Sequence, residues 1–130
     1  MKVSRSSGYA LLAMNYFGKN PDKKIILSQE ISRKYDIPLE YLLKILQQLV
    51  RAAILRSKRG PRGGFSLNKT LKKISMLEII EAVDGPMSTQ LNLMEHASKE
   101  KFCTKAEQAY QKATDQAKAV LKKTKIADLV

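Results

Sequence analysis

The sequence predicts a mainly α-helical fold, in which a winged helix-turn-helix domain with a small β-hairpin wing precedes a long C-terminal helix. Three observations predict it. Apolar residues recur at helical spacing in several stretches, a Gly- and Arg-rich turn separates two short runs with strand character, and the last helical stretch carries mostly alanine on its apolar face. We therefore expect a winged helix-turn-helix domain at 1–86, a linker at 87–103, and a dimerisation helix with a tail at 104–130.

The length and charge of the chain restrict the classes of protein it can belong to. Its 130 residues suffice for one domain, or one domain with an extension. Residues 1–70 hold 14 Lys and Arg against 4 acidic residues, and residues 71–130 hold 10 against 8. This excess of positive charge favours a polyanion as partner. No apolar run reaches the roughly 18 residues of a membrane span and no signal peptide is evident, so we expect a cytoplasmic protein without a membrane partner.

The first half begins with two predicted helices. The first covers residues 4–17 and is expected to be ended by Gly18 and Asn20-Pro21. Its apolar face is predicted to contain Ala10, Ala13, Met14 and Phe17, widened by Leu12 and Tyr16. Ser28 is expected to cap a second helix that runs to about Tyr35.

A third helix is predicted from Pro38, because proline suits the first helical turn. Its buried face is predicted to contain Leu42, Ile45, Leu46 and Leu49. The opposite face carries Glu40, Lys44, Gln47 and Arg51. A DNA major groove admits one α-helix, and long polar side chains can bond there to base edges or flanking phosphates. A single polar face is nevertheless more common as solvent-facing surface.

Residues 54–67 are predicted to form a β-hairpin, the wing. Residues 54–58 and 65–67 are the expected strands, and residues 59–64 form the turn. No acidic residue occurs between Glu40 and Glu78. The turn could instead serve backbone freedom alone or cradle a phosphate, although it lacks the spacing of a nucleotide-binding loop. Helix and wing together predict DNA contacts by Glu40, Lys44, Gln47, Arg51, Lys58, Arg59 and Arg62.

Two capping boxes predict the later helices. Ser75 to Glu78 is expected to begin a helix that ends near Val83, and Thr104 to Glu107 to begin the C-terminal helix. The apolar face of the latter is predicted to contain Ala106, Ala109, Tyr110, Ala113, Ala117, Val120 and Leu121. We expect this face to pair two copies of the chain. Folding back on the first helix of the same chain is the alternative.

Short groups of residues along the whole chain resemble a known family. These groups are residues 1–4, 8–11, 37 with 41–42, 59–60 with 63–65, 79–80 with 83–86, and 127–129. They are similar to the Rrf-two family of bacterial winged-helix transcriptional regulators, of the IscR/NsrR/CymR type. The resemblance implies a homodimeric repressor that binds a palindromic operator, with Glu40 and Lys44 reading bases and Arg59 reaching the minor groove. It also suggests a regulatory protein partner.

The cysteine content departs from this family. Members that hold an iron-sulfur cluster carry three cysteines after the Gly-Pro pair, whereas this chain has only Cys103, at what resembles the last of those positions. Because such clusters need several thiolates, we expect no cluster and no other metal cofactor. Cys103 is expected either as a small apolar residue beside Phe102 or as a redox-sensing thiol favoured by Lys101 and Lys105. His96 is expected on the surface.

The sequence indicates a binding protein and not an enzyme. It offers no Ser/His/Asp set, no paired carboxylates in a plausible cleft and only one histidine for acid-base work. The predicted function is therefore sequence-specific DNA binding in transcriptional regulation. The same charge pattern would also serve RNA, so a winged-helix RNA-binding or architectural protein is the alternative.

Overall fold

A computed structural model describes residues 2–59, 64–97 and 99–130. The elements, in chain order, are α1 (Arg5–Lys19), α2 (Ser28–Tyr35), α3 (Leu39–Arg51), β1 (Leu55–Lys58), β2 (Gly64–Leu67), the 3₁₀ turn η1 (Leu71–Lys73), α4 (Met76–Asp84), α5 (Met94–Ala97), α6 (Lys101–Lys123) and α7 (Ile126–Leu129). The predicted helical fold with a two-stranded wing is confirmed.

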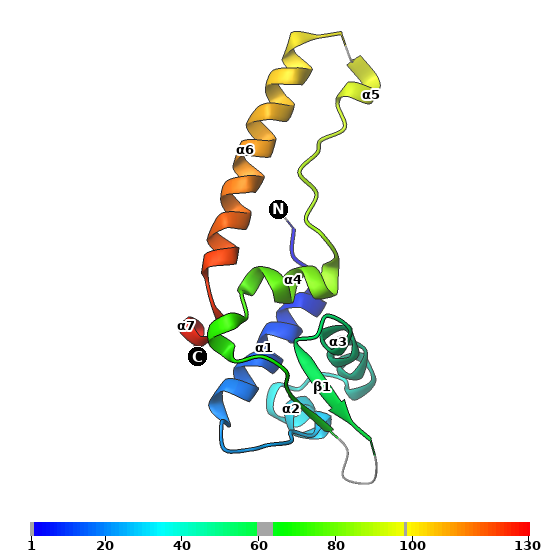
Figure 1. Cartoon of the computed structure of the whole chain (residues 1–130). Coiled ribbons are helices and arrows are strands. Elements are labelled where there is room, and N and C mark those ends of the chain that lie inside the picture. The colour runs from blue at the N-terminus through cyan, green and yellow to red at the C-terminus, as the bar shows by residue number, and fades with distance from the viewer. Residues whose placement is uncertain (1, 60–63, 98) are drawn as a thin grey trace.

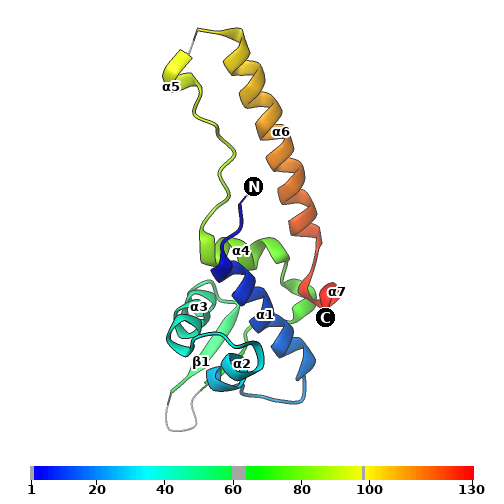
Figure 2. The same cartoon turned by 180° about the vertical axis from the view of Figure 1, so that it is seen from behind.

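Figures 1 and 2 show two regions of different shape. The body consists of α1 to α4, the wing, η1 and α7. The arm, residues 87–123, projects from the body; the chain leaves through an extended segment with α5 at its end and returns through α6. Among the described residues, no helix combines the length and the apolar character needed to cross a bilayer.

The hydrophobic core lies inside the body. α1, α3 and the wing supply most of it, and α7 adds Ile126. The buried side chains include Met14, Phe17, Ile26, Ile31, Ile37, Leu42, Leu46, Leu49, Ile54, Phe65 and Ile79. In contrast, Cys103 and Thr114 are the buried residues of α6 within the described chain.

α1 agrees with the predicted helix, apart from one residue of its apolar face and the exact position of its end. Ser4 is its N-cap, and the Ser4 hydroxyl accepts the Ser7 N–H at 3.1 Å. The prediction that Leu12 widens the buried face is wrong, because Leu12 lies about 200° around the helix from Ala10 and is 38% exposed. The predicted stop at Asn20-Pro21 agrees with the structure, in which Asn20 is the C-cap, whereas Gly18 lies inside the helix.

Gly18 instead permits a close approach between α1 and the C-terminal segment. A Cβ at this position would lie 2.6 Å from Cγ2 of Val130, so a larger residue here would force the Val130 side chain to shift. The part of the chain that returns to α1 is thus the short α7, whose Ile126 is buried.

α2 and α3 form the helix-turn-helix pair. The prediction that Ser28 caps α2 is wrong by one position, since Leu27 is the N-cap and the Glu30 carboxylate accepts its N–H at 3.0 Å. Asp36 takes a left-handed conformation (φ 54°) in the turn. The Ser32 hydroxyl donates to the Ile37 carbonyl at 2.6 Å, which fixes the entry into α3.

α3 ends without a glycine. Ala53 takes a left-handed φ of 60°. Its N–H donates to the Val50 carbonyl at 2.9 Å, and the Ile54 N–H donates to the Leu49 carbonyl at 3.0 Å. This pair of bonds is a Schellman motif, usually built on glycine because left-handed backbone is costly for other residues.

The wing is tied to the body by a contact that the sequence did not predict. β1 and β2 pair antiparallel, with Leu55 opposite Leu67 and Lys58 opposite Gly64. Ile26, ahead of α2, forms a bridge to Phe65 with both N–H···O distances at 2.9 Å. The residues before α2 therefore act as a third, one-residue strand, which sets the orientation of the wing.

One capping box is confirmed and the other is wrong. Ser75 caps α4, and its hydroxyl accepts the Glu78 N–H at 3.0 Å. α6 begins at Lys101, so Thr104 lies inside the helix. The Glu107 carboxylate has other partners, since it accepts the N–H groups of Leu91 at 3.1 Å and Leu93 at 2.9 Å.

Candidate nucleic-acid interface

The outer side of α3 carries a continuous polar stripe. Its buried residues face the core as predicted, and the α3 stripe is formed by the exposed residues Glu40, Lys44, Gln47 and Arg51. At 100° per residue, these four positions fall within an arc of about 60°. They therefore present one narrow row of long side chains, which matches the dimensions of a helix lying in a groove.

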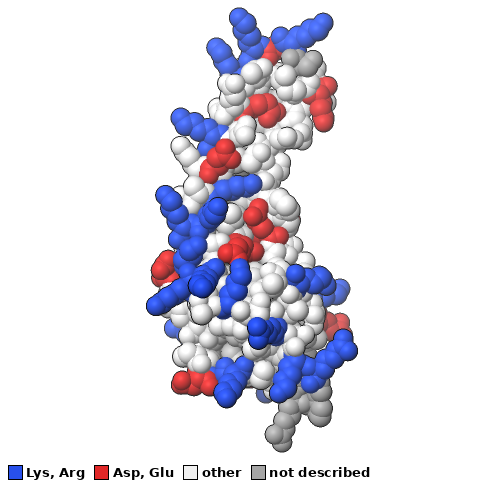
Figure 3. Space-filling model, viewed as in Figure 1, with Lys and Arg blue, Asp and Glu red and all other residues white. Residues whose placement is uncertain are grey.

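The base of the wing extends this surface. Lys58, at the end of β1, and Arg59, directly after it, are both exposed. Arg56 donates from Nε to the Asn68 side chain, which braces β1 against the segment that follows β2. Arg62, predicted as a DNA contact, lies outside the described residues. In Figure 3, Lys and Arg side chains lie over the lower part of the molecule, where β1 lies in Figure 1, and also along the arm.

Among the residues that the structure describes, the charges of this surface form no ion pairs. Among the described residues, the ion pairs are Lys23–Glu30 and Lys69–Glu78, and neither involves the α3 stripe or the wing. Glu40 is the one acidic member of the stripe. The surface can thus attract a polyanion while Glu40 penalises partners that offer no hydrogen-bond donor beside it.

The Glu30 carboxylate links α2, the first helix of the helix-turn-helix pair, to α1 and to the segment before α2. It accepts the Tyr16 hydroxyl at 3.1 Å and pairs with Lys23. The hydrogen bond from Lys23 lowers the pKa of Glu30, which keeps this carboxylate ionised at the start of α2. The positive end of the α2 dipole is thereby satisfied.

A hollow next to the stripe, with both polar and apolar lining, was not predicted. This α1–α3 hollow has a volume of about 300 Å³ and lies between the start of α1 and one flank of α3. Its lining residues are Ser6, Tyr41, Lys44, Ile45, Gln48 and Arg51. The Ser6 and Tyr41 hydroxyls bond to each other. Sequence spacing could not reveal this pair, because its members are 35 positions apart.

Cys103 and His96 lie in the arm, away from this surface. Cys103 is the third residue of α6 and is 5% exposed, whereas its neighbour Phe102 is 72% exposed. His96 lies in α5 and is exposed, as expected. Within the part of the chain that the structure describes, no three His, Cys, Asp or Glu side chains form a group that could hold a metal ion.

A helix-turn-helix with a basic wing defines a class of winged-helix nucleic-acid-binding proteins, and comparisons identify the family within that class. Residues 3–130 match the Rrf2 family, which is described as an iron-dependent transcriptional regulator. The chain belongs to the Rrf2 family of transcriptional regulators. The resemblance noted from the sequence is confirmed, and so is the expectation that the chain is not an enzyme.

Relatives of known sequence agree with this assignment. The chain is 37% identical over 98 residues to BadM of Rhodopseudomonas palustris, covering 75% of this chain and 60% of BadM. It is 33% identical over 86 residues to the HTH-type transcriptional regulator IscR of Cereibacter sphaeroides, covering 65% of this chain and 56% of that protein. The chain therefore spans less than two thirds of the length of these relatives.

Solved structures show the same fold over nearly the whole chain. CymR, the global cysteine regulator of B. subtilis, superimposes with a TM-score of 0.83 at 24% identity, covering 99% of this chain and 95% of CymR. IscR of T. potens gives a TM-score of 0.74 at 20% identity, covering 99% of this chain and 85% of that one.

Proposed function

We propose that this chain binds double-stranded DNA in a sequence-dependent manner, as a homodimeric regulator that represses transcription by occupying a palindromic operator. The observation that carries the proposal is the α3 stripe, a row of four exposed polar residues beside an exposed basic wing base. Lys44, Gln47 and Arg51 can donate to base edges or phosphates, while Glu40 can accept from a cytosine amino group. Arg59 is proposed to reach the minor groove.

The dimer part of the proposal is supported by the exposed side of α6. Four apolar residues there fall within an arc of about 40° at 100° per residue, and they form the α6 face: Phe102, Ala109, Ala113 and Val120. Val120 is 63% exposed. The remaining members of the predicted face, among them Ala106 and Tyr110, are half-buried against the chain itself.

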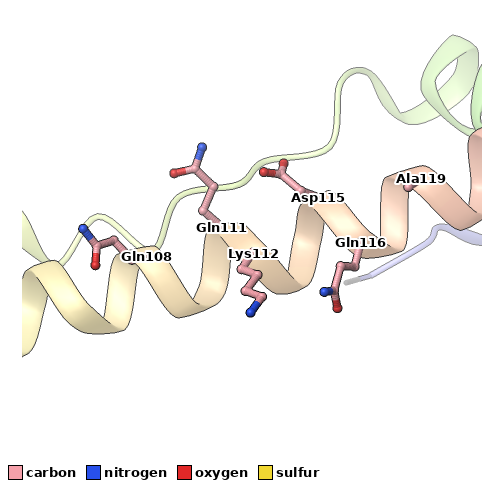
Figure 4. A pocket seen from close by; sticks show the side chains of 6 residues that line it. All are labelled: Gln108, Gln111, Lys112, Asp115, Gln116 and Ala119. Atoms are coloured by element: carbon pink, nitrogen blue, oxygen red, sulfur yellow. The ribbon is translucent and has the colours of Figure 1, made fainter.

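Figure 4 shows the side chains that line a second hollow, on α6. A shallow hollow of about 430 Å³ is lined by residues of α6: Gln108, Gln111, Lys112, Asp115, Gln116 and Ala119. The side chains of Lys112 and Gln116 point away from the extended segment of the arm. This hollow is centred about 110° around the helix from the α6 face, so it is not part of that face. Small residues such as Ala109 and Ala113 let two helices approach closely, so a second copy of α6 is the partner that fits a self-complementary two-fold contact at the α6 face.

We further propose that the chain works without an iron-sulfur cluster, although its family is described as iron-dependent. The chemistry of the donor set supports this: the chain has one cysteine and one histidine, Cys103 is buried, and His96 is exposed. Iron-sulfur clusters require several thiolates. A signal would then come through a protein partner or through the Cys103 thiol, and the regulator would act in the cytoplasm, on chromosomal DNA.

The test is fluorescence anisotropy with a duplex selected from a random pool and with a scrambled duplex, each across a salt series. We expect the selected duplex to bind roughly 10³-fold or more tightly, with a log-log salt slope of about −0.9 per phosphate contact. Equal binding of both duplexes would contradict a sequence-reading regulator and would favour an architectural role. Tighter binding of single-stranded or structured RNA would favour the RNA-binding alternative.

The dimer has its own test in the variant Ala113→Glu. A charge placed within a two-fold apolar contact is left uncompensated, so we expect monomers in sedimentation experiments at concentrations where the unmodified chain is dimeric. Gln111→Glu is the matched control, since it adds the same charge about 200° around the helix. Dimers that withstand Ala113→Glu would rule out the α6 face as the contact.

A further inference from the structure

We propose that the α1–α3 hollow is an anion site that holds one backbone phosphate of DNA beside the groove occupied by α3. This inference rests on the proposed function and adds to it a contact outside the α3 stripe. The hollow measures about 300 Å³. That volume is at the lower end of small-molecule pockets, which span roughly 300–1,000 Å³, so it suits a phosphate group better than a large effector.

The hydroxyl pair in the hollow leaves one hydrogen for a ligand. Ser6 and Tyr41 are bonded to each other, and either oxygen can be the donor. Each hydroxyl carries one hydrogen, so the mutual bond uses one and the other remains free. Whichever way the bond runs, the pair therefore offers one O–H to a further acceptor. A phosphate oxygen is such an acceptor.

The polar groups of the hollow are held in place before any ligand arrives. The Tyr41 ring packs edge-on against the Tyr9 ring, with centroids 5.7 Å apart. The Gln48 side chain donates to the Val83 carbonyl at 3.4 Å, and Ile45 beneath them is 2% exposed. A preorganised site loses less conformational entropy on binding.

The charge around the hollow favours an anion. Lys44 and Arg51 line it, and neither pairs with a carboxylate among the described residues. Glu40 lies about 100° around α3 from Tyr41, on the groove-facing side. Asp84, the last residue of α4, accepts the Ser4 N–H at 3.0 Å and the Ser4 hydroxyl, so each of its carboxylate oxygens already has a hydrogen-bond donor.

The position of the hollow favours DNA over a free anion. Lys44 and Arg51 belong both to the hollow and to the α3 stripe, so the two surfaces are continuous. When a helix lies in the major groove, its flanks face the phosphate rows that border the groove. A phosphate in the hollow would fix the depth and register of α3, and Tyr41 is thus a positioning residue for base readout.

The test uses Tyr41→Phe in a Ser6→Ala background, because Tyr41→Phe alone would leave the Ser6 O–H free to donate to a phosphate. In the comparisons below, Tyr41→Phe denotes this double variant, which removes both hydroxyls and keeps the ring, and Tyr110→Phe in the arm is the control. We expect Tyr41→Phe to weaken binding to selected and scrambled duplexes by a similar factor of roughly tenfold, the usual loss for a hydrogen bond to a charged group. The salt slope should stay unchanged, because a neutral hydroxyl releases no counterion. Lys44→Met should lower the slope by about one phosphate contact.

A second measurement leaves the protein unmodified. Single phosphates of the selected duplex are replaced in turn by neutral methylphosphonates. At one position, we expect the replacement to weaken DNA binding by the unmodified protein but to cause no further loss of binding by Tyr41→Phe. This is the result expected when the hydroxyl and that phosphate are partners in one contact. The absence of such a position would overturn the inference, even if Tyr41→Phe weakens binding.

The outcomes separate this inference from the proposed function. If selected duplex is preferred and Tyr41→Phe binds like the unmodified protein, the phosphate site is wrong and the regulator stands. If selected and scrambled duplexes bind alike, the regulator is wrong, while the effect of Tyr41→Phe on scrambled duplex still decides the phosphate site. Inorganic phosphate that shifts Tyr41 resonances, with unchanged duplex binding by Tyr41→Phe, would overturn the assignment to DNA.

Discussion

The body and the arm are held together by different forces. In the body, α1, α2, α3 and the wing share one apolar core, and side chains such as Leu46 and Ile31 are fully buried. In the arm, α6 leaves Phe102 and Val120 largely exposed, and Glu107 ties the extended segment to the helix by polar bonds. The body therefore holds the proposed DNA-binding surface on a packed core, whereas the arm leaves apolar surface exposed, where the proposed second copy would pack.

The largest expected effect comes from opening the core of the body. Leu46→Ala should lower the free energy of unfolding by about 2–5 kcal/mol, because a buried leucine is replaced by a cavity. Urea titration followed by circular dichroism measures this. Leu12→Ala is the control, since Leu12 is 38% exposed and should cost much less. Equal losses would mean that the core is not where the structure has it.

A smaller loss should follow from separating the wing from the body. A Cβ at Gly64 would lie 2.7 Å from Cγ2 of Ile25 and 2.8 Å from the Ile26 carbonyl oxygen. Gly64→Ala should therefore cost about 1–3 kcal/mol, as overpacking does. Gly8 has no atom near a Cβ, so Gly8→Ala should instead stabilise α1 by about 0.5–1 kcal/mol. Thermal unfolding of the two variants should move in opposite directions.

A second substitution should also stabilise the body. Ala53→Gly relieves the left-handed backbone at the end of α3 and should raise the free energy of unfolding by about 1 kcal/mol. Ala52 has an ordinary φ of −83°, so Ala52→Gly should lower stability instead. Denaturant midpoints report both effects. A loss from Ala53→Gly as large as that from Ala52→Gly would contradict the Schellman ending.

The arm should loosen in acid. Hydrogen bonds from the backbone N–H groups of Leu93 and Leu91 lower the pKa of Glu107. A carboxylate with a lowered pKa stabilises the fold above its ordinary pKa, and this contribution is lost as the pH falls through the lowered value. The Leu91 and Leu93 amides should therefore stay protected from hydrogen exchange near neutral pH and lose this protection in acid.

Glu107→Gln supplies the control for that experiment. It removes the charge, so the two amides should be less protected at all pH values, and the acid-dependent change should vanish. Protection that stays constant with pH in the unmodified chain would show that Glu107 does not hold the extended segment of the arm.

Local patterns predicted the body well and the arm less well. The periodicity of α3 and the Ser75 capping box depend on residues a few positions apart, so the sequence contains the whole signal. The Ile26–Phe65 bridge and the Ser6–Tyr41 pair join distant segments and leave no local pattern. The Thr104 box failed because Glu107 bonds to the extended segment of the arm instead of capping the helix.

The central claim is that the body reads DNA while the arm pairs two bodies, so that two α3 helices meet successive major grooves on one side of the duplex. The most direct test inserts about 5 base pairs, half a helical turn, between the half-sites of the selected duplex. We predict that affinity falls to that of a single half-site. Unchanged affinity for the interrupted site would contradict the claim, because the two bodies would then read DNA independently.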